Sequence, residues 1–371
     1  MFSQRSCGCL IGSLVLLHGS FGISRAMADD EYELKMIDNS KTFSQAIAVN
    51  ATLDVLGTRE VVEGPGLVMK SYFRSGDTDV QINPPKDFSN IEPLALSDTG
   101  VVVGYVSRPA GNENGSLRGF AWESKTNKLT LLDPLPTDIA GHAQDVSADG
   151  KRITGYSTGH TPPRIRPCVW QWQEDSQQYV PQALSTIIPN NPFLQASQVI
   201  ISPNGTLIAA CIAEEQVSDF MFDSSLFVWE YSENGQWKRK KLSEEQPKLK
   251  DMNDQGIIVG STSGEEAVRA CVIDTDGNIQ LIDLLPDDQS NVAYGINNTG
   301  TVVGMSDDPP GAEGGPQAFI WHKGVVEPLK LLKGTVDSAA IAINQEGAIA
   351  GFLLKDTPEE ASVVSFIRKR K

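Results

Sequence analysis

The motif with the clearest link to chemistry is Gly155-Tyr156-Ser157-Thr158-Gly159, which matches the Gly-x-Ser-x-Gly pattern of serine hydrolases. That pattern makes a nucleophile elbow only at a sharp strand-to-helix turn, where the serine hydroxyl is exposed. Here the motif begins at the end of a strand-like run, and Gly104, Gly260 and Gly304 end corresponding runs elsewhere. We therefore interpret Gly155 as a structural glycine and predict that Ser157 is not a nucleophile.

Metal-ligating residues are few and scattered. His142, His160 and His322 are the three histidines beyond residue 28, and none has a spacing such as His-Glu-x-x-His. Asp274-x-Asp276-Gly277-Asn278 has the opening of a calcium loop but lacks the downstream glutamate of an EF-hand. Such a segment more often forms a hairpin turn. Calcium therefore stays a candidate partner only, and we assign no catalytic, cofactor-binding or metal-binding residue.

The elements that hold these residues recur along the chain. The segment AYGINNTGTVVG, which ends at Gly304, has relatives that end at Gly57, Gly104, Gly155, Ala210, Gly260 and Gly351. The intervals between them are 44 to 55 residues. A period of this length with strand-like content indicates a solenoid, a propeller or another repeat array.

Each unit is expected to contain four short strands and almost no helix. A turn joins strands one and two, with Asn or Ser at its entry and a glycine that tolerates positive φ near its end. Strand three carries an aromatic motif such as Phe120-Ala121-Trp122 or Phe319-Ile320-Trp321. The turn-entry residues are Asn50, Ser97, Ser147, Ser202, Asn253, Asn297 and Asn344, so we count seven units.

The two ends of the chain complement each other. The seventh unit has strands one to three, ending with Val364 to Ile367, and then the sequence stops at Lys371. Tyr32 to Ile37 is an alternating strand without a unit of its own, and it resembles the fourth strand of other units. We therefore predict an all-β, seven-bladed β-propeller of four-stranded antiparallel blades, closed by the N-terminal strand joining the C-terminal blade. An open β-solenoid is the alternative.

The propeller model places the variable links on one face. Ser107 to Leu117, Thr158 to Pro167 and Ser306 to Pro316 connect strands two and three and are rich in Gly, Pro and charge. That face is where binding is expected. Two acids, Asp145 and Asp251, stand in strand one and could converge on the central channel; the equivalent residues are Ala48, Ala95, Ile200, Gly295 and Ala342.

Aromatic residues and cysteines are interpreted as packing groups. Four tryptophans recur on strand three, where large rings fill the wedge between twisted sheets, although sugar stacking is the alternative; they are Trp122, Trp170, Trp229 and Trp321. Cys168 and Cys271 occupy strand-three positions that carry phenylalanine in other units. Together with Cys211 they are expected to be free thiols.

Residues 1–28 have the form of a secretory signal peptide. Arg5 precedes the short apolar run Leu10 to Leu17, and Ala26-Met27-Ala28 forms a small-x-small cleavage site. We expect cleavage after Ala28, a secreted or periplasmic protein, and one propeller domain over residues 29–371. That domain carries 29 basic and 47 acidic residues, a net charge of −18. This charge argues against nucleic acid and against membrane partners, and no later run could insert in a bilayer.

The repeated units resemble those of a known family. Gln317-Ala318-Phe319-Ile320-Trp321 and Ile296-Asn297-Asn298-Thr299-Gly300 are similar to the His-Ala-Phe-x-Trp and Ile-Asn-x-x-Gly segments of the extracellular HAF repeat, over Glu31 to Lys371. The signature histidine is replaced by Gln317 here, and by Arg118 and Pro167 in other units. The resemblance implies an exported bacterial repeat protein and brings no catalytic motif.

The sequence leaves three functions open. The leading hypothesis is a monomeric, non-enzymatic binding or interaction module for an unidentified protein or glycan. The alternatives are a propeller-type hydrolase or lyase with acids converging on the channel, and a structural component of the cell surface. Close carboxylates with a basic partner at the channel would favour the enzyme, whereas an apolar or small-residue lining would favour the binding module.

Overall fold

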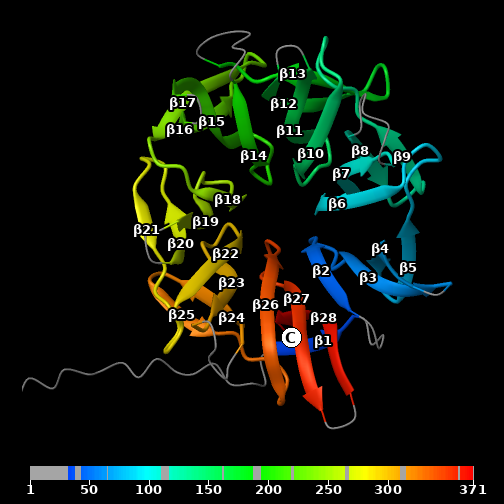
Figure 1. Cartoon of the computed structure of the whole chain (residues 1–371), viewed down its shortest axis with the longest axis vertical. Helices are drawn as coiled ribbons and strands as arrows, with labels where there is room; N and C mark the ends of the chain where they lie inside the picture. Colours follow the sequence, from blue (N-terminus) through cyan, green and yellow to red (C-terminus); the bar gives the residue numbers. More distant parts are fainter. Residues whose placement is uncertain are drawn as a thin grey trace, which may run out of the picture.

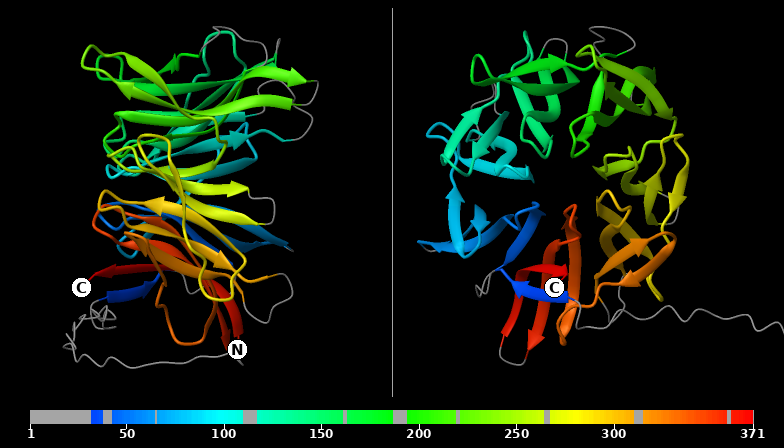
Figure 2. Two further views of the ribbon diagram at one scale, coloured as in Figure 1. Left: turned by 90° about the vertical axis from the view of Figure 1, so that its left-hand side faces the viewer. Right: turned by 180° about the vertical axis from the view of Figure 1, so that it is seen from behind.

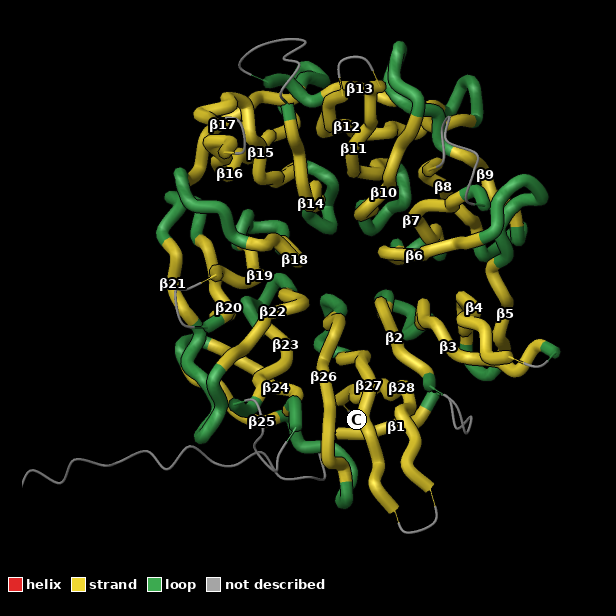
Figure 3. The backbone as a smooth tube through the Cα atoms, viewed as in Figure 1, coloured by secondary structure: helices red, strands yellow, loops and turns green. Residues whose placement is uncertain are grey.

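The computed structural model consists of seven four-stranded antiparallel sheets arranged as blades around a central axis (Figures 1 and 2). It describes residues 32–37, 43–64, 66–109, 117–160, 163–186, 194–218, 221–263, 267–309, 315–357 and 360–370. Within these ranges every regular element is a strand, as Figure 3 shows. The signal peptide expected at 1–28 and the central parts of the three variable links lie outside the described residues.

Each blade takes four strands, and each of the first six blades uses them in chain order from the axis outwards. Blade 1 contains β2 (Ser44–Val49), β3 (Val55–Glu63), β4 (Gly66–Ser75) and β5 (Thr78–Ile82). Blade 2 contains β6 (Asn90–Leu96), β7 (Val101–Ser107), β8 (Leu117–Glu123) and β9 (Lys128–Leu131). Blade 3 contains β10 (Ala140–Val146), β11 (Arg152–His160), β12 (Pro163–Gln173) and β13 (Gln178–Ala183). Blade 4 contains β14 (Gln195–Ile201), β15 (Leu207–Ser218), β16 (Met221–Tyr231) and β17 (Trp237–Ser243). Blade 5 contains β18 (Lys248–Met252), β19 (Ile258–Ser263), β20 (Val268–Ile273) and β21 (Ile279–Leu281). Blade 6 contains β22 (Ser290–Ile296), β23 (Val302–Asp307), β24 (Gln317–His322) and β25 (Val325–Pro328).

The seventh blade joins the two ends of the chain. It contains β26 (Thr335–Ile343), β27 (Ile349–Thr357) and β28 (Glu360–Arg370), and β1 (Tyr32–Met36) pairs with β28 as the outermost strand. Lys35 lies opposite Ile367, and the N–H of Ile37 donates to the carbonyl oxygen of Ser365 at 2.9 Å. The predicted closure is therefore confirmed, as are the seven blades, and the open solenoid is excluded.

The turns between strands one and two also link neighbouring blades. In blade 6, the Asn297 Oδ1 accepts hydrogen bonds from the N–H groups of Thr299 and Thr301, which fixes the turn. Gly300 has φ 77°, the left-handed region that favours glycine. The Asn297 Nδ2 donates to the carbonyl of Asn344 in blade 7, and the Asn344 Nδ2 donates to the carbonyl of Asn50 in blade 1 at 2.8 Å. Where the residue that starts a turn is asparagine, it thus also links its blade to the next one.

The core lies between the blades. Trp122, Trp170 and Trp229 are at most 2% exposed, and Trp321 is also buried. Trp122 packs against Phe73 of the preceding blade, with ring centroids 5.5 Å apart. The tryptophans therefore form inter-blade contacts, as predicted, and have no face available for a sugar ring.

The three cysteines in the described part of the chain are buried free thiols, as predicted: Cys168, Cys211 and Cys271. Burial raises the pKa of Cys211 and of Cys271 to about 12. A thiolate is the reactive form of cysteine, so these groups are unsuited to nucleophilic chemistry.

Candidate functional site

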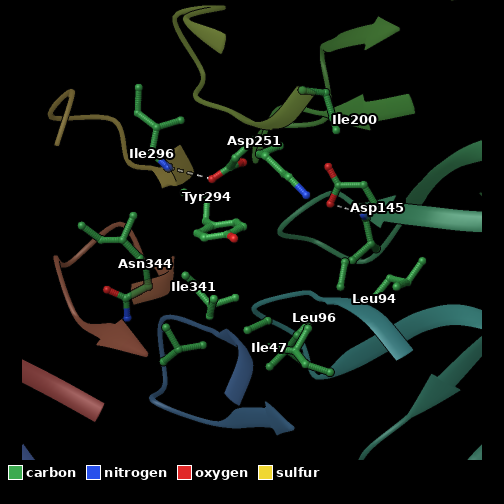
Figure 4. A pocket seen from close by; sticks show the side chains of 18 of the residues that line it. Ile47, Leu94, Leu96, Asp145, Ile200, Asp251, Tyr294, Ile296, Ile341 and Asn344 are labelled. Carbon is green, nitrogen blue, oxygen red and sulfur yellow. Dashed lines mark hydrogen bonds between the residues drawn. The ribbon is translucent and has the colours of Figure 1, made fainter. Parts of the chain in front are cut away.

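The main cavity follows the axis of the propeller and has a volume of about 660 Å³. Its wall is made mostly of the innermost strand of each blade and of the turns that follow these strands. Figure 4 shows Asp145, Asp251 and Tyr294 on one part of this wall and Ile47, Leu96 and Ile341 on another. We take this channel as the candidate site, because it collects side chains from all seven blades.

Every innermost strand contains a β-bulge, and in six of the blades the bulge aims one additional side chain at the channel. In blade 3 the register passes from Ala143 opposite Gly155 to Asp145 opposite Thr154, which leaves Gln144 unpaired. Corresponding register shifts occur in the other six blades. Six bulge residues line the cavity: Ile47, Leu94, Gln144, Lys250, Tyr294 and Ile341. Sequence reasoning missed these residues, since it considered only the position that follows each bulge.

The bulge explains the glycine that ends each repeat motif. A Cβ on Gly155 would lie 2.0 Å from the carbonyl oxygen of His142, and a Cβ on Gly260 would lie 2.0 Å from that of Lys248. A Cβ on Gly104 or on Gly351 would likewise lie 2.0 Å from a carbonyl oxygen of strand one. The carbonyl just before each bulge thus points at strand two, and only glycine leaves room for it.

Blade 4 departs from this pattern in a consistent way. It has Ala210 where the other blades have glycine. Between the pairs Ser197–Cys211 and Ile200–Ala209, Ala210 of β15 and two residues of β14 have no partner in the other strand. Gln198, on the facing strand, adopts φ 49°. The bulge has therefore been displaced to accommodate the alanine methyl group, with a left-handed residue as the consequence.

The two predicted acids both reach the channel, although their blades are not adjacent. Asp145 accepts hydrogen bonds from the N–H of Val146 and from the N–H of Ile201 in the next blade, both at 2.8 Å. Asp251 likewise accepts from Met252 at 2.7 Å and from Ile296 of the next blade at 2.9 Å. Each carboxylate thus bridges two blades through both of its oxygens.

The protein surroundings raise the pKa of both acids to about 7. The main cause is burial, which disfavours the charged carboxylate, and the backbone N–H groups oppose it. The charge of Asp145 further raises the pKa of Asp251, so the two acids interact across the cavity. Both residues are half-buried and line the cavity.

Lys250 and Tyr294 give the channel a second kind of polar group. The Lys250 Nζ lies 5.5 Å from the centroid of the Tyr294 ring, in a cation–π contact. Among the described residues, neither the Lys250 ammonium nor the Tyr294 hydroxyl has a hydrogen-bond acceptor, and no ion pair joins Lys250 to an acid. Burial, and then the charge of Lys248, lowers the pKa of Lys250. Tyr294 points into the cavity in Figure 4.

Other candidates from the sequence lie away from this channel or serve the fold. Ser157 is buried in β11, where its hydroxyl accepts from the N–H of Leu135 at 2.9 Å, so the Gly-x-Ser-x-Gly segment is a strand and not an elbow. Asp274 accepts from the N–H groups of Asp276 and Asn278, which braces a hairpin turn as predicted. No group of three or more metal-ligating side chains occurs within the described ranges.

The histidines take separate structural positions. His142 is stacked between Tyr105 and Tyr156, with ring centroids 4.1 and 4.8 Å away, and burial lowers its pKa to about 4. His322 contacts the Thr301 hydroxyl through Nδ1 at 3.3 Å. His160 ends β11. They therefore share no site.

Comparison with known proteins supports the fold alone. No protein-family model matches the chain, and no curated protein matches its sequence. The β-propeller domain of the trilobed protease from Pyrococcus furiosus is 10% identical, with a TM-score of 0.55, over 88% of this chain and 93% of that one. That domain is described as having an open velcro topology, whereas here β1 and β28 close the ring.

Two whole peptidases contain a similar propeller. The acylaminoacyl peptidase of Pyrococcus horikoshii is 12% identical with a TM-score of 0.52, over 87% of this chain and 51% of that one. A puromycin-hydrolysing peptidase of Mycobacterium tuberculosis is 13% identical with a TM-score of 0.54, over 87% of this chain and 51% of that one. This chain thus spans about half the length of these peptidases. The structural similarity agrees with the class of protein that the seven blades define, a β-propeller. Sequence identities this low assign the chain to no family.

Within the described ranges, no helix is long and apolar enough to cross a bilayer.

Proposed function

We propose that this protein is an exported, non-enzymatic binding module, which holds a protein or glycan through the loops of one propeller face and the mouth of the channel. The propeller fold suits this role, because it presents the strand-two to strand-three connections of every blade on one side. The fold similarity to propeller domains is compatible with the proposal but does not identify a ligand.

The hydrogen bonds that the two channel acids accept from the backbone support a binding role over catalysis. Each carboxylate oxygen of Asp145 and of Asp251 accepts a backbone N–H, and the donors for each carboxylate come from two blades. A general acid or base must reach the substrate proton within hydrogen-bond distance, in a geometry its own contacts allow. These contacts instead give the carboxylates a role in joining blades. The channel also has no cation paired with them in the described part of the chain.

Export and membership of the HAF-repeat proteins belong to the same proposal. They rest on residues 1–28 and on the repeat motifs of the sequence. Cell fractionation, followed by N-terminal sequencing of the mature protein, tests the first of these. A mature chain that begins at Asp29 and lies outside the cytoplasm would support it, whereas a full-length cytoplasmic protein would contradict it.

The binding role is tested by a screen of the purified protein against glycan and protein arrays, with and without added calcium. The proposal expects a saturable ligand and no turnover of it on long incubation. Conversion of a ligand to product, reduced by replacing Asp145 or Asp251 while the protein stays folded, would instead favour the hydrolase or lyase alternative. Concentration-dependent self-association without a ligand would favour a structural component of the cell surface.

A further inference from the structure

We propose that the channel binds an amphiphilic carboxylate, whose charged end is held by Lys250 and Tyr294 and whose hydrocarbon body lies against Ile47, Leu94 and Ile341. This inference rests on the proposed binding function and names a ligand class for the channel.

The case for an anion begins with hydrogen-bond donors that have no protein acceptor. The Lys250 ammonium and the Tyr294 hydroxyl lie on adjacent blades and are in contact through the cation–π interaction. Neither has an acceptor among the described residues. Gln144 also lines the cavity, and its Oε1 accepts from the N–H of Val199 at 2.7 Å. A carboxylate accepts from several such donors at once.

The neighbouring acids do not satisfy these donors. Both oxygens of Asp145 and of Asp251 already accept from backbone N–H groups, and neither acid forms an ion pair with Lys250 within the described ranges. Because their pKa values are raised to about 7, they also carry less negative charge near neutral pH than ordinary aspartates. The Lys250 ammonium therefore has no ion-pair partner among the described residues of the cavity.

The part of the wall formed by blades 7, 1 and 2 carries several apolar side chains. Ile47, Leu94 and Leu96 come from blades 1 and 2, and Ile341 and Phe352 come from blade 7. Figure 4 shows Ile47, Leu96 and Ile341 facing the side of the cavity that carries Tyr294. A volume of about 660 Å³, apolar on one side with a few directed polar groups on the other, fits the usual form of a small-molecule site.

The site also predicts how binding depends on pH. The titratable groups that line the cavity are Asp98, Asp145, Lys250, Asp251 and Tyr294, with Lys248 close to Lys250. As the pH falls through 7, Asp145 and Asp251 lose their negative charge. This change favours an anion, so affinity for a carboxylate should rise between pH 8 and pH 6. Burial raises the pKa of Tyr294, which therefore stays neutral over this range.

The experiment compares three probes with one hydrocarbon chain and different charge: decanoate, decanol and decyltrimethylammonium. Binding to the full protein is measured by titration calorimetry at pH 6 and pH 8, below the concentration at which the probes form micelles. We expect decanoate to bind about tenfold more tightly than decanol at pH 6, the usual effect of one charge-assisted hydrogen bond. Lys250→Gln should remove this difference, and Lys128→Gln, on the outermost strand of blade 2, should keep it.

Several results would overturn the inference. Equal binding of decanoate and decanol would show that the channel does not recognise the charge. Preference for the ammonium probe would show that the two aspartates make the electrostatic potential in the channel negative. Retention of decanoate binding in a folded Lys250→Gln variant, or no binding of any probe, would also refute it. A ligand found in the glycan and protein screen would leave the proposed binding function intact in each case.

Discussion

Replacing Gly155 with alanine tests the link between the repeat glycine and the channel bulge. A Cβ at this position would lie 2.0 Å from the carbonyl oxygen of His142 and 3.0 Å from the Ala143 Cα. These are backbone atoms, so no side-chain rotation can relieve the contact. The carbonyl must instead move by about 1.4 Å to reach the 3.4 Å of ordinary contact, in a strand whose bulge is fixed by its pairing with β11.

The expected loss of stability lies at the upper end of the range for overpacking. Inserting a methyl group into packed surroundings usually costs about 1–3 kcal/mol, and a clash with backbone leaves little room for relaxation. We therefore expect Gly155→Ala to lower the free energy of unfolding by about 3 kcal/mol. In a chain of this size that is a decrease in Tm of about 4 °C.

Urea unfolding followed by tryptophan fluorescence measures this change, since buried tryptophans occur in several blades. Gly66→Ala is the matched control, because no atom lies within 4 Å of the added methyl and the φ there is not positive; its effect should stay within about 0.5 kcal/mol. Ala210→Gly, in the blade whose bulge is displaced, should lose only about 0.5–1 kcal/mol, the usual cost of a glycine in a strand. If Gly155→Ala unfolds at the same urea concentration as Gly66→Ala, the explanation of the glycines is wrong.

Three further outcomes follow from the same structure. Asp251→Ala should lower the free energy of unfolding by about 2 kcal/mol, because the N–H groups of Met252 and Ile296 lose their acceptor, and Asp251→Asn should lose less; equal stability of all three proteins in urea would contradict this. The raised pKa values of Asp145 and Asp251 mean that the folded state holds protons more tightly than the unfolded state. The stability that this proton binding adds to the folded state is therefore complete below about pH 4 and is lost as the pH rises through about 7. The stability of the natural protein relative to Asp145→Asn should accordingly be greater at pH 5 than at pH 8, and an unchanged or reversed difference would refute it. Removal of β1 should expose the edge of β28, lower the Tm and promote self-association in size-exclusion chromatography, whereas a stable monomer would show that closure by β1 contributes little.

Much of this architecture could be read from local patterns, because the information is repeated seven times. A turn-entry Asn or Ser, a glycine at positive φ and an aromatic strand three recur in most units, so errors in one unit are corrected by the others. The closure by Tyr32 to Ile37 followed from counting strands, since the last unit lacked one. Burial of the tryptophans and cysteines followed from their shared position on strand three.

The lining of the channel was decided by tertiary structure. A bulge adds one residue to a strand and changes which side chain faces the axis, and it leaves no distinct signature in the strand that contains it. Lys250 and Tyr294 are ordinary residue types in ordinary strands, and only the bulge places them in the cavity. The sequence identified Asp145 and Asp251 as candidates, but their contacts with the N–H groups of the following blade depend on how the blades pack together. The repeated local chemistry therefore determined the ring, whereas the contacts between blades determined what the ring presents to a ligand.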